Sequence, residues 1–407
     1  MSEWKETEIG LIPSDWHIDK LENHVQPQRG ITYGIVKVGD FVPGGVPVIR
    51  GGDIRDGSIV FDDQKRVAEE VSNQFRRTIL QGGEILLNLI AEPGHAAIVP
   101  DELMSSNVSR DVAVIPLDDS VDHKFVCYFL RSEASITWLT NRLQGTVTQK
   151  INLGVLRELP ILLMSLDEQR RIAHFLDCLD RSISNLRRQN ETLERIAQTL
   201  FKHWFVDFEF PNADGKPYKS SGGEMRSSEL GEIPVGWRVQ ELGKISEVGT
   251  GKGLKRHEFQ EDGIYPVLGA NGEMGRTNKF LKEEKLILTG RVGTLGVISL
   301  SNGKVWISDN VIMILPTIKS FYFVYFCLRK TNLKLLNRGS TQPLITQGDV
   351  KKIVFAMPGD ELLLSFERLC LPIFHKVEHN IRQIQTLTQT RDTLLPKLMS
   401  GKLRITP

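Results

Sequence analysis

An internal duplication constrains the fold of this 407-residue sequence more than any other feature. Residues 8–21 read EIGLIPSDWHIDKL, and residues 229–242, which begin 221 residues later, read ELGEIPVGWRVQEL. A repeat of roughly 200 residues is far longer than the period of a solenoid, which runs to about 50 residues. The sequence therefore predicts two similar domains on one polypeptide, suited to a target that also has two parts. Two later pairs of segments keep the same order: FVCYFLR (125–131) with FVYFCLR (323–329), and GTVTQKIN (145–152) with GSTQPLIT (339–346).

The bulk composition excludes several classes of protein. With 40% hydrophobic and 25% charged residues, the composition is ordinary for a soluble globular protein, and the chain is long enough for two or more cores. Its start lacks the basic and apolar regions of a signal peptide, and no apolar run approaches the roughly 18 residues that span a bilayer. The net charge of +1 argues against a histone-like binder, although one face of a domain can still be basic. Because the four cysteines lie far apart in apolar surroundings, we expect buried free thiols in the cytoplasm rather than disulfides or zinc: Cys127, Cys178, Cys327 and Cys370.

Short β-like runs separated by Gly, Pro, Asn and Asp turns dominate both copies. Examples are VPVIRG and EILLNLIA in the first copy and YPVLGANG and KLILTG in the second. A helix is expected over roughly 122–143 in the first copy and roughly 320–336 in the second, from their apolar periodicity. Each copy is therefore predicted to be an α+β unit with a mostly β core.

Each copy ends in a heptad pattern, with apolar residues at alternating spacings of three and four. Two such helices in one chain most simply pack on each other. We expect an antiparallel coiled coil with a pseudo-twofold repeat, because a parallel pair would force one globular unit to span the helix length. Two amphipathic helices on separate cores are the alternative. The predicted coiled-coil interface consists of Leu176, Leu179, Ile183, Leu186, Leu193, Leu200, Ile373, Val377, Ile384, Leu387, Leu394 and Leu398, with Asn190 and Asn380 also on the seam.

These patterns divide the chain into five parts. Residues 211–228 (PNADGKPYKSSGGEMRSS) have the composition of an exposed linker. The expected divisions are a first mostly-β domain over 1–160, a first long helix over 161–210, the linker over 211–228, a second mostly-β domain over 229–357, and a second long helix with a C-terminal tail over 358–407.

No catalytic motif occurs in the sequence. It has no phosphate-binding GxxxxGK[ST], no HExxH, no GxSxG and no Asn-Pro-Pro-aromatic motif. The GTGKG stretch at 249–253 lacks the spacing of a nucleotide-binding loop, which indicates a turn that exposes nearby basic residues. His375 and His379 have the i, i+4 spacing of metal ligands, but a solvated helix face explains them better because no third ligand accompanies them. We therefore expect no catalytic residue and no metal site in this chain.

Several loops carry side chains suited to nucleic acid. Arg, Lys, Asn and Gln make bidentate contacts with base edges, whereas Ser and Thr commonly bind phosphate. Thr148, Gln149 and Lys150 follow a repeated glycine, and we match them with Thr341 and Gln342 of the second copy. Each loop alone could be an ordinary polar loop, but their recurrence in both copies favours DNA binding. The candidate DNA-binding residues are Arg50, Asn88, His95, Thr148, Gln149, Lys150, Lys252, Lys255, Arg256, Asn271, Arg276, Arg291, Thr341 and Gln342.

The whole chain resembles the specificity (S) subunit of type I restriction–modification enzymes. The resemblance rests on the paired openings IGLIPSDW and LGEIPVGW, on VPVIRGGDI and IYPVLGANG, on RVGTLG, on LDEQRRIAHFLDCLD and on the ending TLLPKLMSGKLRI. The second copy departs from the pattern, because it has ELLLSFERL where the first has the EQRRI signature.

The resemblance implies two target-recognition domains, each binding one half of a split double-stranded DNA sequence. The two helices would set the distance between the half-sites and dock two methyltransferase subunits, which restriction (motor and nuclease) subunits join. This chain would be non-catalytic, with S-adenosylmethionine, ATP and Mg²⁺ bound by the partner subunits, and it would have no membrane partner.

Two other functions remain open from the residues alone. One is a self-sufficient DNA methyltransferase or nuclease, which the absence of a cofactor-binding glycine motif counts against. The other is a coiled-coil scaffold without a DNA role. Incubation of the chain with DNA and labelled S-adenosylmethionine tests the first alternative, and DNA retardation with the partner subunits tests the second.

Overall fold

The computed structural model describes residues 3–55, 57–61, 65–90, 94–143, 149–292, 295–339 and 343–405. The chain forms two compact units. Unit 1 consists of Met1–Leu186 and Arg382–Pro407, and unit 2 of Arg187–Ile381. Helix α5 (Leu166–Phe205) therefore begins in unit 1 and ends in unit 2, and α9 (Asp360–Met399) does the reverse.

Unit 1 is an α+β unit around a four-stranded antiparallel sheet in the order β10-β9-β12-β4. Its two central strands are β9 and β12, and every apolar residue in them is buried. A continuous run of buried apolar residues is the pattern of a strand covered on both faces. The elements before α5 are β1 (Trp4–Thr7), β2 (Gly10–Pro13), β3 (His17–Lys20), η1 (Leu21–His24), β4 (Thr32–Tyr33), β5 (Val46–Ile49), η2 (Gly51–Asp53), β6 (Ile54–Arg55), β7 (Ser58–Ile59), β8 (Arg66–Val67), α1 (Glu69–Asn73), η3 (Arg76–Thr78), β9 (Ile85–Asn88), β10 (Ala96–Ile98), η4 (Asp101–Leu103), β11 (Asn107–Val108), β12 (Val112–Ile115), α2 (His123–Leu130), α3 (Glu133–Thr140), α4 (Leu153–Arg157) and β13 (Pro160–Leu163).

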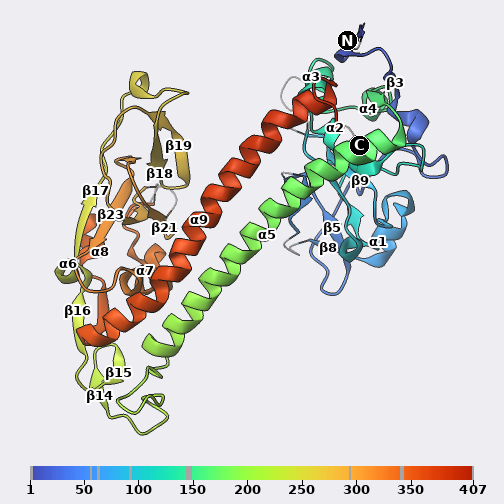
Figure 1. Ribbon diagram of the computed structural model, residues 1–407. Helices are drawn as coiled ribbons and strands as arrows, with labels where there is room; N and C mark the ends of the chain where they lie inside the picture. The colour runs from blue at the N-terminus through green and yellow to red at the C-terminus, as the bar shows by residue number, and fades with distance from the viewer. Residues whose placement is uncertain are drawn as a thin grey trace. The chain divides into compact units, whose positions relative to one another are not determined.

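Unit 2 repeats this plan with a four-stranded antiparallel sheet in the order β21-β20-β23-β17. Figure 1 labels the main elements of both units. The elements between α5 and α9 are β14 (Met225–Ser228), β15 (Gly231–Pro234), β16 (Arg238–Glu241), α6 (Leu242–Ile245), β17 (Ser246–Thr250), η5 (Arg256–Glu258), β18 (Tyr265–Gly269), β19 (Gly272–Thr277), β20 (Leu286–Gly290), β21 (Ile298–Ser301), β22 (Trp306–Ile307), β23 (Val311–Pro316), α7 (Phe321–Lys330), η6 (Leu333–Leu336), α8 (Gln347–Lys351) and β24 (Val354–Met357).

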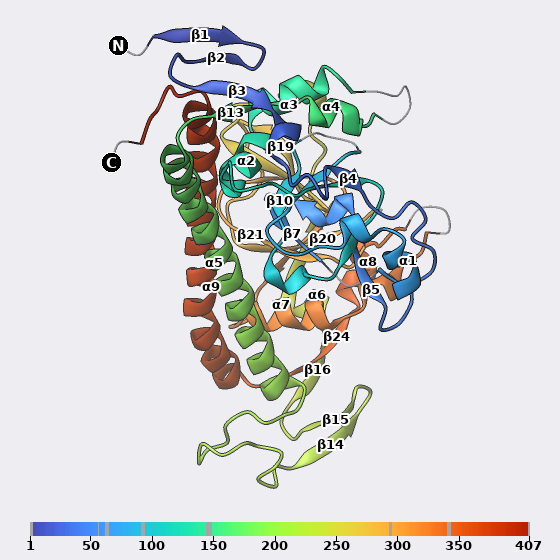
Figure 2. The same cartoon turned by 90° about the vertical axis from the view of Figure 1, so that its right-hand side faces the viewer.

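The two units have the same topology, which confirms the predicted duplication. Each contains a three-stranded sheet with one parallel pair, β11-β5-β8 in unit 1 and β22-β18-β19 in unit 2. Each also contains an opening hairpin, β1–β2 or β14–β15, and a two-stranded pair just before the long helix, β3–β13 or β16–β24. Figure 2 shows each opening hairpin at the periphery of its own unit.

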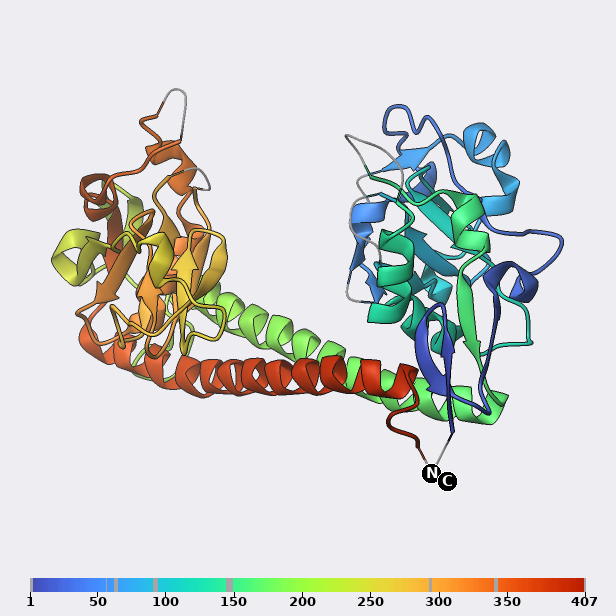
Figure 3. The same ribbon diagram turned by 90° about the horizontal axis from the view of Figure 1, so that it is seen from above.

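The two long helices pack antiparallel within each unit. In unit 1, Arg391 Nη1 lies 2.8 Å from Asp180 Oδ1; in unit 2, Asn380 Nδ2 lies 2.8 Å from Asn190 Oδ1, and the rings of Trp204 and Phe366 are 6.1 Å apart. The partner number falls as the α5 number rises, so the predicted antiparallel arrangement is confirmed. Figure 3 shows both helices as unbroken ribbons. All twelve residues assigned to the interface are buried or half-buried.

The ends of the heptad seam also belong to the globular cores. Leu176 and Leu398 lie in the main core of unit 1, whereas Phe366 and Cys370 lie in the main core of unit 2. A coiled coil and two amphipathic helices on separate cores were expected to be alternatives. Each long helix instead does both, because it packs on the other helix along the seam and on the core of a unit.

Three local expectations differ from the structure. The segment expected as a linker is folded: Tyr218 stacks on Phe210 with ring centroids 4.6 Å apart, and the last four residues, Met225–Ser228, form β14. The helix expected over 122–143 is two helices, because α2 ends at Leu130 and Ser132 caps the start of α3. Cys178 is exposed on α5, in contrast to Cys127, Cys327 and Cys370, which are buried as expected.

Candidate nucleic-acid interface

In unit 1, three of the predicted DNA-binding residues meet at one end of the four-stranded sheet. Asn88 ends β9, and its backbone N–H donates to the carbonyl of His95 at 3.0 Å. The loop that contains Arg50 lies against the same strand end, since a Cβ atom added to Gly51 would come within 2.3 Å of Asn88 Oδ1. The carboxylate of Asp111 accepts from the Gly51 N–H at 3.1 Å and holds this loop in place.

Gln149 and Lys150 join the same region. Lys150 forms a β-bridge with Ile90, two residues after Asn88, and the Ile151 N–H donates to the Leu89 carbonyl at 2.8 Å. Both candidate side chains are exposed. Thr148 lies outside the described residues.

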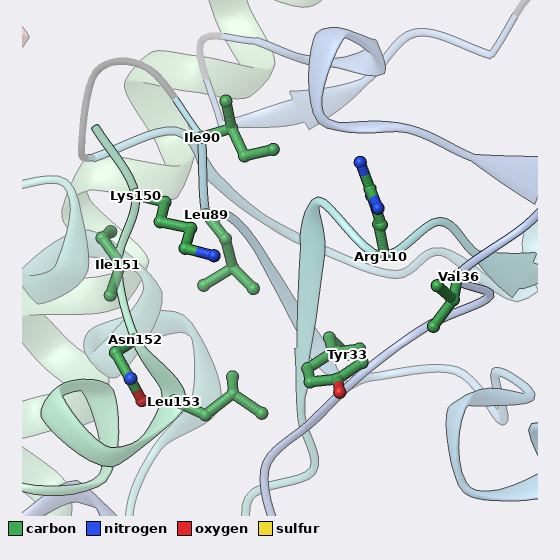
Figure 4. A pocket seen from close by; sticks show the side chains of 9 residues that line it. All are labelled: Tyr33, Val36, Leu89, Ile90, Arg110, Lys150, Ile151, Asn152 and Leu153. Carbon is green, nitrogen blue, oxygen red and sulfur yellow. The ribbon is translucent and has the colours of Figure 1, made fainter. Parts of the chain in front are cut away.

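A hollow of about 560 Å³ opens beside this strand end. Figure 4 shows Arg110, Lys150 and Tyr33 around it on three different segments of the chain. These three side chains are exposed, and two of them are cationic, so the hollow offers hydrogen-bond donors and an aromatic face to a ligand. The sequence reasoning missed Arg110 and Tyr33; the one signal was an Arg in a turn between two apolar strands. The hollow is lined by Tyr33, Val36, Leu89, Ile90, Arg110, Lys150, Ile151, Asn152 and Leu153.

Arg291 occupies the equivalent place in unit 2. Its backbone N–H donates to Asn310 at 2.8 Å and its carbonyl accepts from Ile345 at 3.0 Å, which repeats the bonds of Leu89 with Asp111 and Ile151. Arg291 therefore takes the place of Leu89, and its side chain is half-buried.

The β-bridges beside these residues set the register between the two copies and correct one expected match. Lys150 bridges to Ile90, and Leu344 bridges to Val292, so Lys150 and Leu344 are equivalent. Counting back one residue, Gln149 corresponds to Pro343 and not to Gln342. The expected match failed because the glycine and the threonine were aligned without the backbone pairing that sets the register. Thr341 and Gln342 lie outside the described residues.

Lys252, Lys255 and Arg256 are all exposed on the loop that follows β17. Gly251 makes this loop possible, because a Cβ atom there would lie 2.1 Å from the Ile307 carbonyl oxygen. The Lys255 N–H donates to Glu258, whose carboxylate also binds Lys279, and the Lys279 ammonium lowers the pKa of Glu258. The GTGKG stretch is therefore an ordered strand end that presents cations, as its spacing predicted.

Arg276 and Asn271 lie on the β18–β19 hairpin with different surroundings. The Arg276 guanidinium donates to the Gly263 and Ile264 carbonyls at 2.8 and 3.0 Å, so it holds the base of the hairpin. Asn271 is exposed in the turn between the strands. We infer that Arg276 positions the hairpin and that Asn271 is the more available of the two for DNA.

Other features of the described residues add no catalytic group. No cluster of three or more His, Cys, Asp or Glu side chains within them could hold a metal ion, and His375 and His379 are exposed on α9. Burial raises the pKa of the Cys127 thiol to about 11 and that of Cys370 to about 12, which makes them poor nucleophiles. None of the helices formed by the described residues is long and apolar enough to cross a membrane.

Two units of one topology each carry basic side chains at the same end of the same sheet: Lys150 in unit 1, and Arg291 and Lys252 in unit 2. The family described as the type I restriction modification DNA specificity domain matches residues 39–195 and 234–361. The chain belongs to this family. Its role is that of a specificity subunit, a non-catalytic subunit that recognises DNA.

Two relatives agree with this assignment, and one solved structure has the same fold. The chain is 28% identical to the type I restriction enzyme MjaIX specificity subunit of Methanocaldococcus jannaschii, over 99% of this chain and 97% of the relative. It is also 28% identical to the EcoBI specificity subunit of Escherichia coli, over 47% of this chain and 42% of the relative. The crystal structure of a type I restriction–modification S subunit from M. genitalium has the same fold, with a TM-score of 0.58, 19% identity and coverage of 94% and 96% of the two chains.

Proposed function

We propose that this chain recognises a bipartite DNA sequence, with one half-site bound by each unit, and directs methylation and cleavage by partner subunits. The observation that carries the proposal is the repeated sheet end: Asn88 and Lys150 in unit 1, and Arg291 with the Lys252 loop in unit 2. Donor side chains gathered in equivalent places suit base edges and phosphates.

The assembly follows from the same assignment. Two methyltransferase subunits would dock on the α5–α9 pair, and restriction subunits would join them in the cytoplasm. S-adenosylmethionine, ATP and Mg²⁺ would bind to those partners. Because the chain carries a net charge of +1, its own phosphate contacts are few, and the partners would supply much of the affinity for DNA.

Genome-wide mapping of methylated bases tests the proposal. The chain is co-expressed with its methyltransferase partner in a host without other methylation, and single-molecule sequencing identifies the modified motif. We expect one split motif with a fixed spacer. A continuous motif, or methylation by this chain alone with labelled S-adenosylmethionine, contradicts the proposal.

An insertion in α5 tests the further idea that the helices set the spacer. Four added residues near Gln189 lengthen a helix by about 6 Å and rotate the residues beyond the insertion by about 40°, which matches roughly one additional base pair. We expect the same half-sites with a spacer longer by about one base pair. Four residues inserted after Asp214, outside the helices, serve as the control and leave the spacer unchanged. An unchanged spacer with the first insertion would mean that the helices do not set the distance.

A further inference from the structure

The turn that follows the parallel strand pair is equivalent in the two units. In unit 1, β11 pairs in parallel with β5, and the Val112 N–H donates to the Ser109 carbonyl at 3.1 Å. In unit 2, β22 pairs in parallel with β18, and the Val311 N–H donates to the Ser308 carbonyl at 3.1 Å. The residue after each serine therefore stands at one shared position.

Opposite charges occupy this shared position, Arg110 in unit 1 and Asp309 in unit 2, and both residues are exposed. The neighbouring loops match as well: the Ile35 N–H donates to the carbonyl that ends β11 at 2.8 Å, and the Lys252 N–H donates to the carbonyl that ends β22 at 2.9 Å. Val36 next to Arg110 thus corresponds to Gly253, whose added Cβ would lie 3.7 Å from Asp309 Oδ2.

Both charged groups are available to a ligand. Within the described residues, the Arg110 side chain forms no hydrogen bond or ion pair, and it borders the hollow of Figure 4. Asp309 accepts one hydrogen bond, from the Ser308 hydroxyl to Oδ1 at 3.1 Å, which leaves Oδ2 open.

We propose that Arg110 and Asp309 are specificity-determining residues that bind bases of opposite hydrogen-bonding character. Arg110 would donate to guanine O6 and N7 in one half-site, and Asp309 would accept from the exocyclic amine of cytosine or adenine in the other. A carboxylate near DNA is repelled by the phosphates, so an exposed acid at this position is better explained by a base amine than by the backbone. The inference rests on the proposed function and adds the residues that set the two half-sites.

Substitution of each residue tests the inference in the assembled methyltransferase complex. Arg110→Ala should relax one guanine position of one half-site, and Asp309→Ala should relax one amine-bearing position of the other, each by roughly 5- to 150-fold in discrimination. Arg110→Lys keeps the charge but not the bidentate fork, so it should relax the same position while retaining the salt dependence of binding. Arg238→Ala and Asp214→Ala, at exposed positions elsewhere, are matched controls and should leave the motif unchanged.

Modified bases make the assignment specific. Replacing the sensitive guanine with 7-deazaguanine should weaken binding by the wild-type complex and have no further effect on the Arg110→Ala complex. Replacing the sensitive cytosine or adenine with an analogue that lacks the amine should behave in the same way with Asp309→Ala. Because both residues are exposed, unchanged thermal melting is expected and checks that each variant is folded.

The outcomes separate this inference from the proposed function. If the wild-type complex methylates no split motif, the proposed function itself fails. If the wild-type motif is split but Arg110→Ala weakens all sequences equally, Arg110 binds phosphate and its assignment is wrong. An unchanged motif with Asp309→Ala, or wild-type binding that is not weakened when the exocyclic amine is removed from the base pair it controls, overturns the assignment of Asp309.

Discussion

The two units attach the same helix pair to the same part of the fold by different chemistry. In unit 1, Asp180 on α5 binds Arg391 on α9 at 2.8 Å, and its second oxygen accepts from Tyr128 and Arg131 on α2 at 2.9 and 3.2 Å. In unit 2, the corresponding α9 residue is Phe374, which stacks on Tyr322 of α7 with centroids 4.2 Å apart. The fold therefore determines where a long helix contacts α2 or α7, but it does not determine which kind of side-chain interaction is made there.

The difference predicts different responses to substitution. The unit 1 contact is an ion network, and buried ion pairs gain little net free energy over apolar packing because desolvation offsets the attraction. The unit 2 contact is an aromatic cluster, which also includes Phe326 at 6.0 Å from Phe374, and gains both burial and ring geometry. The stability of unit 2 should therefore depend more on how well its aromatic rings pack, and the stability of unit 1 more on the presence of both charges.

The largest effect is expected for Phe374→Ala. The side chain is 3% exposed, so its loss leaves a cavity in unit 2 and should cost about 3–5 kcal/mol of unfolding free energy. Hydrogen exchange measured peptide by peptide should show faster exchange in α7 and the first half of α9. Phe175→Ala is the control, since Phe175 is 40% exposed on α5 and should cost far less. Equal losses from both variants would contradict the role given to the cluster.

Removing one partner of the ion network should come next. Arg391→Ala leaves Asp180 with Tyr128 and Arg131 only, and should cost about 3 kcal/mol, near the lower end for a broken buried pair because Asp180 is partly exposed. The fourfold variant Asp180→Leu, Arg391→Met, Arg131→Met, Tyr128→Phe removes every polar member of the network and should recover most of that loss. Thermal melting of the three proteins checks both statements, and a fourfold variant as unstable as Arg391→Ala would show that the charges are needed in themselves.

Much of this architecture could be predicted from the sequence, and the exceptions have physical reasons. The heptads of α5 and α9 and the apolar runs of β9 and β20 are local patterns, so their elements were predictable. The attachment of the helices was not, because Asp180 and Arg391 look like ordinary surface charges until two distant segments meet.

The candidate site shows the same limit. Asn88, His95 and Lys150 were predicted as polar loop residues, and the structure brings them together. Arg110 was not predicted because the hollow that it lines with Tyr33 is formed by segments distant in the sequence, and no local motif indicates such a hollow. The match of Gln149 with Gln342 failed for a related reason, since register is set by pairing across strands.

A smaller effect on stability is expected for the pair of asparagines, Asn190 and Asn380, through which the two long helices meet in unit 2. Asn380 is fully buried and donates to Asn190 at 2.8 Å, whereas the α5 residue at the position equivalent to Asn380 in unit 1 is Leu186. Asn190→Leu alone leaves the buried Asn380 amide with only its longer contact to Gln189 Oε1 at 3.4 Å, and should cost roughly 1–3 kcal/mol. Leucine at both positions should restore or exceed the original stability but loosen the register, as apolar replacement does at polar coiled-coil positions.

Chemical unfolding and disulfide trapping measure these two properties separately. Cysteine pairs placed one heptad apart on α5 and α9 report which registers are sampled. A single trapped register in the double leucine variant would show that the asparagines do not select it.

The smallest expected effect is a pH dependence of opposite sign in the two units. In unit 1, a hydrogen bond from Arg404 lowers the pKa of Asp15, so the stability it contributes is present above the unfolded value of 3.8 and is lost as the pH falls through the lower folded value. In unit 2, burial raises the pKa of Glu367 above its ordinary 4.5, so the folded state holds the proton more tightly and stability falls as the pH rises through that window. Mild acidification from neutral pH should therefore stabilise unit 2 slightly before stronger acid weakens the tail of unit 1.

Glu367→Gln isolates the unit 2 contribution. The amide keeps an acceptor for the Ser320 hydroxyl and the Tyr322 N–H, which the carboxylate binds at 2.8 and 3.1 Å, but it does not titrate. The protection factors in α7, which are exchange rates corrected for the intrinsic pH dependence of amide exchange, should then become independent of pH between about 4.5 and 7, while the acid response of the C-terminal tail is unchanged. Asp15→Asn should do the converse, removing the acid response of the tail and leaving α7 as in the wild type. If both variants altered both regions equally, the two titrations would be coupled and the units would not respond separately to pH.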